Sequence, residues 1–329
     1  MVSLAITKYK TIRWWIVGVG SVLIVTLVIA LGFVIAGKSQ DDAADEESTD
    51  SSEVEYNTGI PSKNEELTEE IVSDESTVRV PEMLTLQSVV DDWASSIGGD
   101  KGVMIYDVDS RRVVAEYDAD EEFALASLYK LFVVYEGYRK VARGEWKIDE
   151  RVDYLGRTVG ECLDAAIRSS DSICAESLLA WMGRDELIDT VNNEFGIEIG
   201  ESIMTASARQ ITELMLRFYR HPEFSDTDLT WQMWDSFLNQ PTTEYNWRQG
   251  LPSGFSDEVK VYNKVGWQWE EDEETGVGSW LIYNDAAIVE FSGLDRKFIV
   301  VVLTSGVGPK SIRMLGTKIE DEVLARLAV

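Results

Sequence analysis

The chain has 329 residues, of which 45% are hydrophobic, so it can form one domain of about 200 to 250 residues with a sizeable core. Its formal net charge is −29. Nucleic-acid binding needs clustered Lys and Arg, so this charge excludes a nucleic-acid partner. A strongly acidic surface more often serves solubility than recognition.

Residues 14–37 form an uncharged and almost entirely apolar segment. A helix needs about 20 such residues to cross a bilayer, so the segment is predicted to be a transmembrane helix. Three basic residues lie within residues 1–13, and acidic residues follow the segment. The positive-inside rule therefore predicts a single-pass membrane protein with a cytoplasmic N-terminus and an extracytoplasmic remainder. A cleaved signal peptide is the alternative, although no A-x-A cleavage site is evident.

Residues 38–80 differ sharply in composition from residues 81–329. Between residues 39 and 78 the chain has fourteen Asp or Glu and one Lys. Such a segment cannot bury enough apolar surface to offset its chain entropy. We predict a disordered acidic linker over 38–80 and a folded domain over 81–329.

The early part of this domain contains a predicted helix and a hairpin. Helical apolar spacing covers residues 84–96, and two short strands at 102–107 and 112–117 are joined by a turn at 108–111. A strongly apolar helix is predicted over residues 127–142.

The rest of the domain is first helical and then β-rich. Residues 158–219 have a mostly helical pattern with breaks at 169–171 and 196–205. Three predicted strands and a closing amphipathic helix follow, at 259–269, 280–291, 297–305 and 310–328. This order predicts an α+β fold resembling an α/β sandwich. In it, both chain ends supply one antiparallel sheet flanked by helices, and the central segments form an all-helical lobe. An active site is expected where the lobes meet.

The two cysteines of the chain are Cys162 and Cys174. An extracytoplasmic location permits a disulfide, but Cys174 begins an apolar helical stretch and is expected to be a small buried core residue. We therefore expect no bridge. The single histidine, His221, precedes a proline at the polar end of a helix and does not favour a Ser-His-Asp triad. One His and two separated Cys give no convincing zinc site, so we predict no metal and no cofactor.

The Ser127-Leu128-Tyr129-Lys130 segment places a hydroxyl and an amine one helical turn apart on the same face. An amine held there can take the serine proton and leave a nucleophilic oxygen. By itself the segment also fits a helix that begins with a serine N-cap. Two further elements follow it in order, Ser170-Asp171-Ser172 and Lys264-Val265-Gly266.

The order and spacing of these three elements resemble those of the penicillin-recognising serine hydrolases, and class A serine β-lactamases in particular. The segment 158–167 before Ser170 and the segment 284–288 after Lys264 also look like their counterparts in that family. The resemblance covers residues 84–329. It implies the β-lactamase/D,D-peptidase-like fold and no cofactor.

The same resemblance assigns roles to individual residues. It makes Ser127 the nucleophile, Lys130 the general base, Ser170 the proton shuttle and Lys264 the anchor of a substrate carboxylate. Backbone N–H groups at Ser127 and Trp267 would form the oxyanion hole. Substrate binding would involve Ser172, Val265, Gly266 and Trp267. Ser172 stands where the family has asparagine, and Val265 lacks the usual hydroxyl.

Strand alternation puts Val265, Trp267 and Trp269 on one face. That face either overlooks the cleft, where the tryptophans can stack on a ring, or packs into the core. The Glu-x-x-Leu-Asn motif that supplies the deacylating base of class A enzymes is missing. Glu198 and Glu201 lie in the corresponding interval, either as bases or as solvated loop carboxylates.

The resemblance implies a serine hydrolase that forms an acyl-enzyme with a β-lactam and hydrolyses it, and the predicted transmembrane helix makes this hydrolase membrane-anchored and extracytoplasmic. The alternatives are a D,D-peptidase-like penicillin-binding protein acting on peptidoglycan peptides, and a non-catalytic cell-wall-binding relative.

Overall fold

The computed structural model describes residues 86–195, 205–221, 227–240, 247–271 and 277–327. All of these belong to one compact unit of the chain. The predicted transmembrane helix over 14–37, the predicted linker over 38–80, Glu198 and Glu201 lie outside the described residues. Within the described ranges, no helix is long and apolar enough to cross a bilayer.

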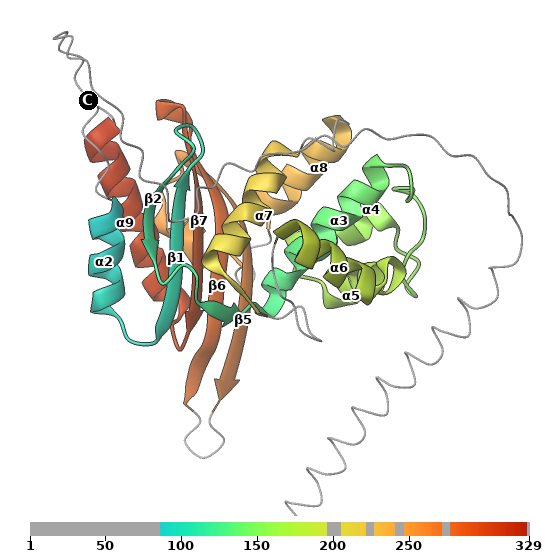
Figure 1. Ribbon diagram of the computed structural model, residues 1–329, viewed down its shortest axis with the longest axis horizontal. Helices are drawn as coiled ribbons and strands as arrows, with labels where there is room; N and C mark the ends of the chain where they lie inside the picture. The colour runs from blue at the N-terminus through green and yellow to red at the C-terminus, as the bar shows by residue number, and fades with distance from the viewer. Residues whose placement is uncertain (1–85, 196–204, 222–226, 241–246, 272–276, 328–329) are drawn as a thin grey trace, which may run out of the picture. The chain divides into compact units, whose positions relative to one another are not determined.

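A five-stranded antiparallel sheet contains strands from both ends of the described unit (Figure 1). Its order is β2-β1-β7-β6-β5. The strands are β1 (Asp100–Asp107), β2 (Arg112–Tyr117), β5 (Val259–Glu271), β6 (Gly278–Phe291) and β7 (Arg296–Ser305). β7 pairs with the whole length of β1, from Asp100 opposite Ser305 to Asp107 opposite Phe298. β5 is an edge strand, and this position leaves one of its sides open toward the helical lobe.

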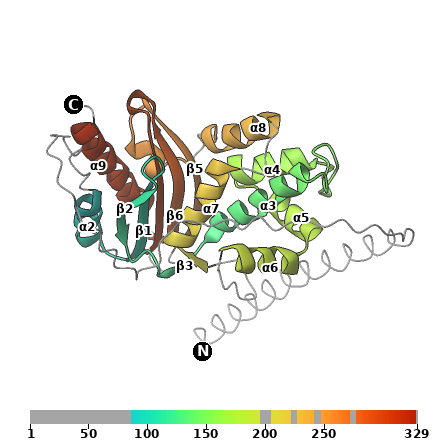
Figure 2. The same ribbon diagram turned by 45° about the horizontal axis from the view of Figure 1, so that its top comes forward.

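Two helices, α2 (Leu86–Ser96) and α9 (Pro309–Leu327), lie side by side on one face of the sheet (Figures 1 and 2). In α2, Leu86, Val90 and Trp93 recur at helical spacing and are fully buried. The indole N–H of Trp93 donates a 2.7 Å hydrogen bond to the Ser311 carbonyl at the start of α9. One hydrophobic cluster therefore joins both helices to this face of the sheet.

The second lobe consists of helices from the middle of the chain (Figure 2). They are α3 (Lys130–Ala142), α4 (Val159–Arg168), α5 (Ser172–Met182), α6 (Arg184–Phe195), α7 (Ala208–Arg220) and α8 (Thr227–Leu238). Capping boxes start two of them, Thr158 with Glu161 at α4 and Ser207 with Gln210 at α7. α7 packs on the remaining face of the sheet, so a second cluster joins that face to the helices.

The architecture confirms the predicted α+β fold, with a sheet from both chain regions and a helical lobe. All five predicted strands are present, and the break between α4 and α5 lies where expected. The helix predicted from residue 127 starts differently, because a 3-10 turn, η1 (Ala126–Tyr129), precedes α3. The pairing of β3 (Glu122–Ala124) with β4 (Thr205–Ser207), the helix α8, and the 3-10 turns η2 (Leu251–Gly254) and η3 (Ser292–Leu294) were not predicted.

Candidate active site

Ser127 lies in η1, between the short strand β3 and helix α3. The preceding residue, Ala126, has a φ of +46°, a conformation that non-glycine residues rarely adopt. Such backbone strain persists only where surrounding contacts impose it. Here the side-chain amide of Asn284 donates hydrogen bonds of 2.8 and 3.2 Å to the carbonyls of Ala124 and Leu125. The segment before Ser127 is thus held by β6.

Lys130 is the first residue of α3, and its side chain is almost completely buried at 1% exposure. Its Nζ lies 3.3 Å from the Ser127 hydroxyl oxygen. It also donates to the Ser170 carbonyl at 2.5 Å and to the Ser172 hydroxyl at 3.0 Å. Burial lowers the pKa of Lys130 to about 8, and the nearby charges of Asp171 and Glu176 oppose part of this shift. About one tenth of the amine is therefore neutral at pH 7 and can accept a proton.

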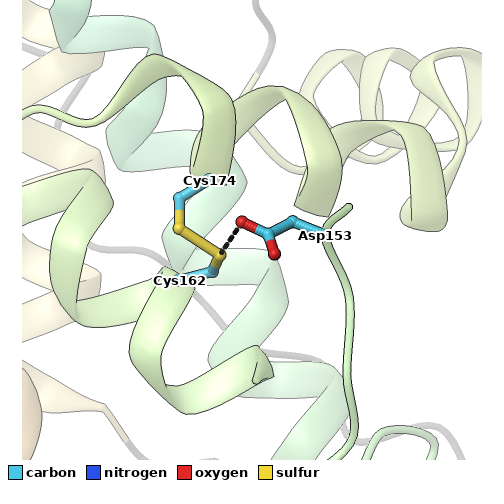
Figure 3. Close-up of side chains that lie close together, drawn as sticks. All are labelled: Asp153, Cys162 and Cys174. Carbon is cyan, nitrogen blue, oxygen red and sulfur yellow. Dashed lines mark hydrogen bonds between the residues drawn. A yellow bond between two sulfur atoms is a disulfide. The ribbon is translucent and has the colours of Figure 1, made fainter. Parts of the chain in front are cut away.

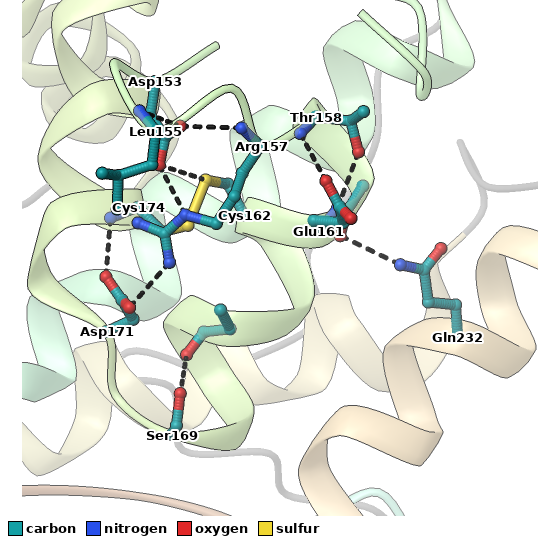
Figure 4. The surroundings of a disulfide bond; sticks show 12 residues. Asp153, Leu155, Arg157, Thr158, Glu161, Cys162, Ser169, Asp171, Cys174 and Gln232 are labelled. Carbon is teal, nitrogen blue, oxygen red and sulfur yellow. Dashed lines mark hydrogen bonds and ion pairs between the residues drawn. A yellow bond between two sulfur atoms is a disulfide. The ribbon is translucent and has the colours of Figure 1, made fainter. Parts of the chain in front are cut away.

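The Ser170 loop connects α4 to α5, and Ser170 itself has a φ of +55°. The next residue, Asp171, caps α5 by accepting a 2.8 Å hydrogen bond from the Cys174 N–H. The other oxygen of Asp171 accepts a 2.8 Å hydrogen bond from Arg157 (Figure 4). This capping fixes the loop, so the strained Ser170 presents both its carbonyl and its hydroxyl to the two lysines.

Lys264 lies on β5 and is also buried, at 1% exposure. Its Nζ donates to the Ser170 hydroxyl at 2.9 Å and to the Val265 carbonyl at 2.6 Å. Burial holds the pKa of Lys264 well below its ordinary value, and the proximity of Lys130 lowers it further. Ser170 therefore stands between two amines that disfavour each other's charge.

A buried carboxyl group lies behind Lys264. Asp285 on β6 accepts hydrogen bonds from the Leu251 N–H at 2.8 Å and from the Asn263 amide at 2.9 Å. Burial raises its pKa to about 7, although these hydrogen bonds and the charges of Arg248 and Lys264 act in the opposite direction. Asp285 raises the pKa of Lys264 in return.

Gly266 brings β5 into close contact with η1. A Cβ atom at this residue would lie 2.2 Å from the Leu125 carbonyl oxygen, 2.7 Å from the Leu128 nitrogen and 3.0 Å from the Ser127 nitrogen. Only glycine allows this approach without displacing backbone. The backbone of β5 thereby runs directly past the Ser127 N–H, and Trp267 is its next residue.

The side chains of Val265 and Trp267 lie on the other face of β5. Val265 is 1% exposed and belongs to the cluster beneath α2 and α9, so core packing accounts for it. Trp267 stacks on Trp247 with a centroid distance of 5.9 Å and meets Trp280 edge-on at 5.8 Å. Trp269 also contacts Trp280, yet it remains 45% exposed.

Cys162 of α4 and Cys174 of α5 form a disulfide, so the expectation of unpaired cysteines was wrong (Figure 3). Their Cα atoms are 4.7 Å apart, because the helix–loop–helix brings the two helices together. Both residues are fully buried, as expected for Cys174. Asp153 lies beside the sulfurs, but a disulfide offers no thiolate to a metal ion. The bridge encloses the loop that carries Ser170, Asp171 and Ser172.

A hollow of about 550 Å³ lies away from these groups. It is lined by residues at the ends of β1 and β7 and around β3, including Asp118, Glu121, Glu122 and Ala124. None of the predicted catalytic residues lines it, so the side-chain geometry defines the candidate site.

A model of the β-lactamase enzyme family matches residues 85–327, well over half of the chain. The chain belongs to this family. No curated protein sequence gives a significant match.

Solved structures show the same β-lactamase fold. An ancestral class A β-lactamase is 19% identical, with a TM-score of 0.58, covering 72% of this chain and 99% of its own. A class A β-lactamase from Bacteroides cellulosilyticus is 16% identical, with a TM-score of 0.62, covering 74% of this chain and 98% of its own. The structure of PBP-A is 17% identical, with a TM-score of 0.60, covering 72% of this chain and 95% of its own.

This β-lactamase family member thus assembles most of the residues singled out in its sequence. The side chains of Ser127, Lys130, Ser170, Ser172 and Lys264 converge, and Gly266 packs against the serine turn. Sequence reasoning missed Asp285 and the pair formed by Tyr129 and Glu176. The polar pair Asn284-Asp285 inside a mostly apolar strand signals buried polar groups, whereas nothing in the sequence joins Tyr129 to Glu176.

Proposed function

We propose that this protein is a serine hydrolase that forms an acyl-enzyme on Ser127 with a β-lactam and then hydrolyses it. The proposed reaction depends most on Lys130, which is buried, lies 3.3 Å from the Ser127 hydroxyl and has a pKa of about 8. A general base works best when its pKa is close to the working pH.

In the proposed acylation, neutral Lys130 accepts the Ser127 proton while the serine oxygen bonds to the carbonyl carbon. Backbone N–H groups of Ser127 and Trp267 would stabilise the oxyanion that forms there. The carbon–nitrogen bond then breaks, and the leaving nitrogen takes the Ser170 hydroxyl proton. Ser170 recovers a proton from the Lys130 ammonium, which leaves both side chains neutral. The 3.3 Å contact between the Lys130 amine and the Ser170 hydroxyl supports this relay.

Lys264 would bind the carboxylate of the substrate. Its pKa is depressed in the protein alone, and a bound anion favours the ammonium form. Substrate binding and protonation of Lys264 are therefore expected to occur together. The Val265 side chain lies in the core on the other face of β5, so carboxylate recognition would depend on Lys264 and not on a side chain at residue 265.

Fluorescent penicillin tests the proposal. The full-length protein in detergent should be labelled covalently, and Ser127→Ala should not. Rapid loss of the label identifies hydrolysis of a β-lactam. If both proteins are labelled alike, or neither is labelled, Ser127 is not the nucleophile. The remaining function is then non-catalytic cell-wall binding, which is favoured by Ser172 and Val265, the residues that differ from the family motifs.

A D,D-peptidase-like penicillin-binding function is the second candidate. It is favoured by the missing Glu-x-x-Leu-Asn motif and by the likeness to PBP-A, which is a likeness of fold. A label that depends on Ser127 and persists for hours identifies this function. The substrate would then be a peptidoglycan stem peptide.

We also propose that residues 14–37 anchor the protein in the membrane and that the hydrolase domain lies on the extracytoplasmic side. The uncharged segment and the basic residues before it support this orientation. Protease added to intact cells should remove the domain and leave a short membrane fragment. Complete protection of the domain would contradict the orientation.

A further inference from the structure

Tyr129 belongs to the same 3-10 turn as Ser127 and connects this turn to α5. Its hydroxyl donates a 2.6 Å hydrogen bond to one carboxylate oxygen of Glu176. The other oxygen lies 3.7 Å from Arg184, and the Glu176 side chain is 54% exposed. A carboxylate is thus fixed beside the serine turn and remains accessible to water.

Helix α5 places the same carboxylate near Lys130 from a second direction. Ser172 opens α5 and accepts a hydrogen bond from Lys130, and Glu176 follows four residues later on the same helical face. The charge of Glu176 also raises the pKa of Lys130, which agrees with this proximity. Glu176 therefore lies beside the turn that carries Ser127 and acts on the charge of Lys130.

Other carboxylates around the two lysines are engaged elsewhere. Asp171 uses one oxygen to cap α5 and the other to bind Arg157. Asp285 is fully buried behind Lys264, where it accepts hydrogen bonds from Leu251 and Asn263. Among the described carboxylates that act on either lysine, Glu176 combines proximity to the serine turn with the greatest exposure to water.

We propose that Glu176 is the general base that releases the acyl group from Ser127, in place of the glutamate of the missing Glu-x-x-Leu-Asn motif. This inference rests on the proposed function, because it requires an acyl-enzyme. Glu176 takes a proton from a water molecule as the water oxygen bonds to the acyl carbon. The bond from that carbon to the Ser127 oxygen then breaks, and the serine oxygen regains a proton that passes from Glu176 through the neutral Lys130 amine. Glu176 and Lys130 thereby return to the protonation states that they had before acylation.

Tyr129 is a positioning residue in this scheme. Its hydrogen bond fixes one oxygen of Glu176. The other oxygen lies 3.7 Å from Arg184, beyond hydrogen-bond distance, and can accept a proton from water. Tyr129→Phe keeps the ring but removes this bond. We expect it to slow release about tenfold, the value of one hydrogen bond to a charged group, and to leave labelling unchanged.

The decisive experiment follows labelling and release of fluorescent penicillin separately in the full-length protein. Glu176→Gln keeps the shape and an acceptor for Tyr129 but removes the base. Loss of the Glu176 charge lowers the pKa of Lys130 further, so we expect labelling at least as fast as in the wild type. Release should be slowed by about 10²- to 10⁴-fold. Glu186→Gln is the matched control, because Glu186 is also 54% exposed and forms an ion pair on the neighbouring helix, with Lys140. This control should release the label at the wild-type rate.

Thermal unfolding separates loss of the base from loss of the fold. If Glu176→Gln proves unstable, Glu176→Asp keeps the charge at a shorter reach and should slow release by an intermediate factor. Unchanged release in Glu176→Gln overturns the inference and leaves the proposed function intact. The same conclusion follows if release is slow in Glu198→Gln or Glu201→Gln and normal in Glu176→Gln. The inference is also overturned if the wild-type protein keeps its label for as long as Glu176→Gln does. Absence of any Ser127-dependent label overturns the proposed function itself.

Discussion

The buried amine of Lys264 donates a 2.9 Å hydrogen bond to the hydroxyl of Ser170, a residue held at a φ of +55°. Two substitutions separate the hydroxyl from the backbone strain. Ser170→Ala and Ser170→Gly both remove the relay and should slow penicillin labelling by at least about 10²-fold. Glycine tolerates the left-handed conformation, so Ser170→Gly should be more stable than Ser170→Ala by about 1 kcal/mol.

Urea unfolding of the two variants measures this difference. Equal stability would show that the left-handed backbone at Ser170 carries no strain. Normal labelling in both variants would exclude the relay.

The rate of labelling should depend on pH through Lys130, whose pKa is lowered to about 8. The reactive form is the neutral amine, and its fraction increases as pH rises. The rate should therefore rise about tenfold per pH unit below pH 8 and level off above it. Stopped-flow labelling between about pH 6 and about pH 10, which spans about two units on either side of this pKa, measures the profile.

Lys130→Arg provides the control for that profile, because a guanidinium stays protonated throughout this range. It should label very slowly and without the rise. A wild-type rate that falls from pH 6 to pH 8, about two units, would contradict Lys130 as the base.

Gly266→Ala should slow labelling strongly. The new Cβ would stand 2.2 Å from the Leu125 carbonyl oxygen and 3.0 Å from the Ser127 nitrogen, so η1 or β5 must move. Because a displacement of about 1 Å can cost about 10²-fold in rate, we expect at least that loss. Gly293→Ala is the matched control, since nothing lies within 4 Å of its Cβ, and it should label normally. Equal rates in the two variants would contradict the close approach.

Removing the Cys162–Cys174 disulfide should destabilise the folded protein by about 3 kcal/mol, the entropy expected for closing a loop of this size. Chemical denaturation of the protein with and without reductant measures the effect. The double variant Cys162→Ala/Cys174→Ala should behave like the reduced protein and be insensitive to reductant. Free thiols in the untreated protein, detected by mass spectrometry after alkylation, would contradict the bridge.

Much of the fold followed from the sequence because its signals are local. Most helices and strands could be predicted from such local patterns, for example the apolar spacing of 3.6 residues in α2 and the β-rich segments around Lys264 and Asp285. The site residues Ser127, Lys130, Ser170 and Lys264 were found through their resemblance to a family motif. The structure adds that each of their polar atoms lies within 3.3 Å of the next, from Ser127 to Lys130, Lys130 to Ser170 and Ser170 to Lys264.

The features that were missed depend on how helices cross. Cys162 and Cys174 are twelve residues apart on different helices, and sequence spacing does not give the angle between α4 and α5. Tyr129 and Glu176 are 47 residues apart, and their contact exists only because α5 packs beside η1 and α3. The alternation of side chains along the strand correctly placed Val265 and Trp267 on one face of β5. It does not show whether that face lines the cleft or packs into the core.

The position of β7 between β1 and β6 has a consequence for biosynthesis. The two strands that flank β7 precede it in the chain, and one of them is separated from it by about half of the protein. A nascent chain that has reached only residue 295 lacks the strand that joins them. Asn284 holds the segment before Ser127 through its side-chain amide, and its side-chain oxygen accepts a hydrogen bond from the Thr304 N–H of β7. The nucleophile is therefore expected to reach its final geometry only after translation has passed β7, and sheets closed by such distant pairings fold slowly.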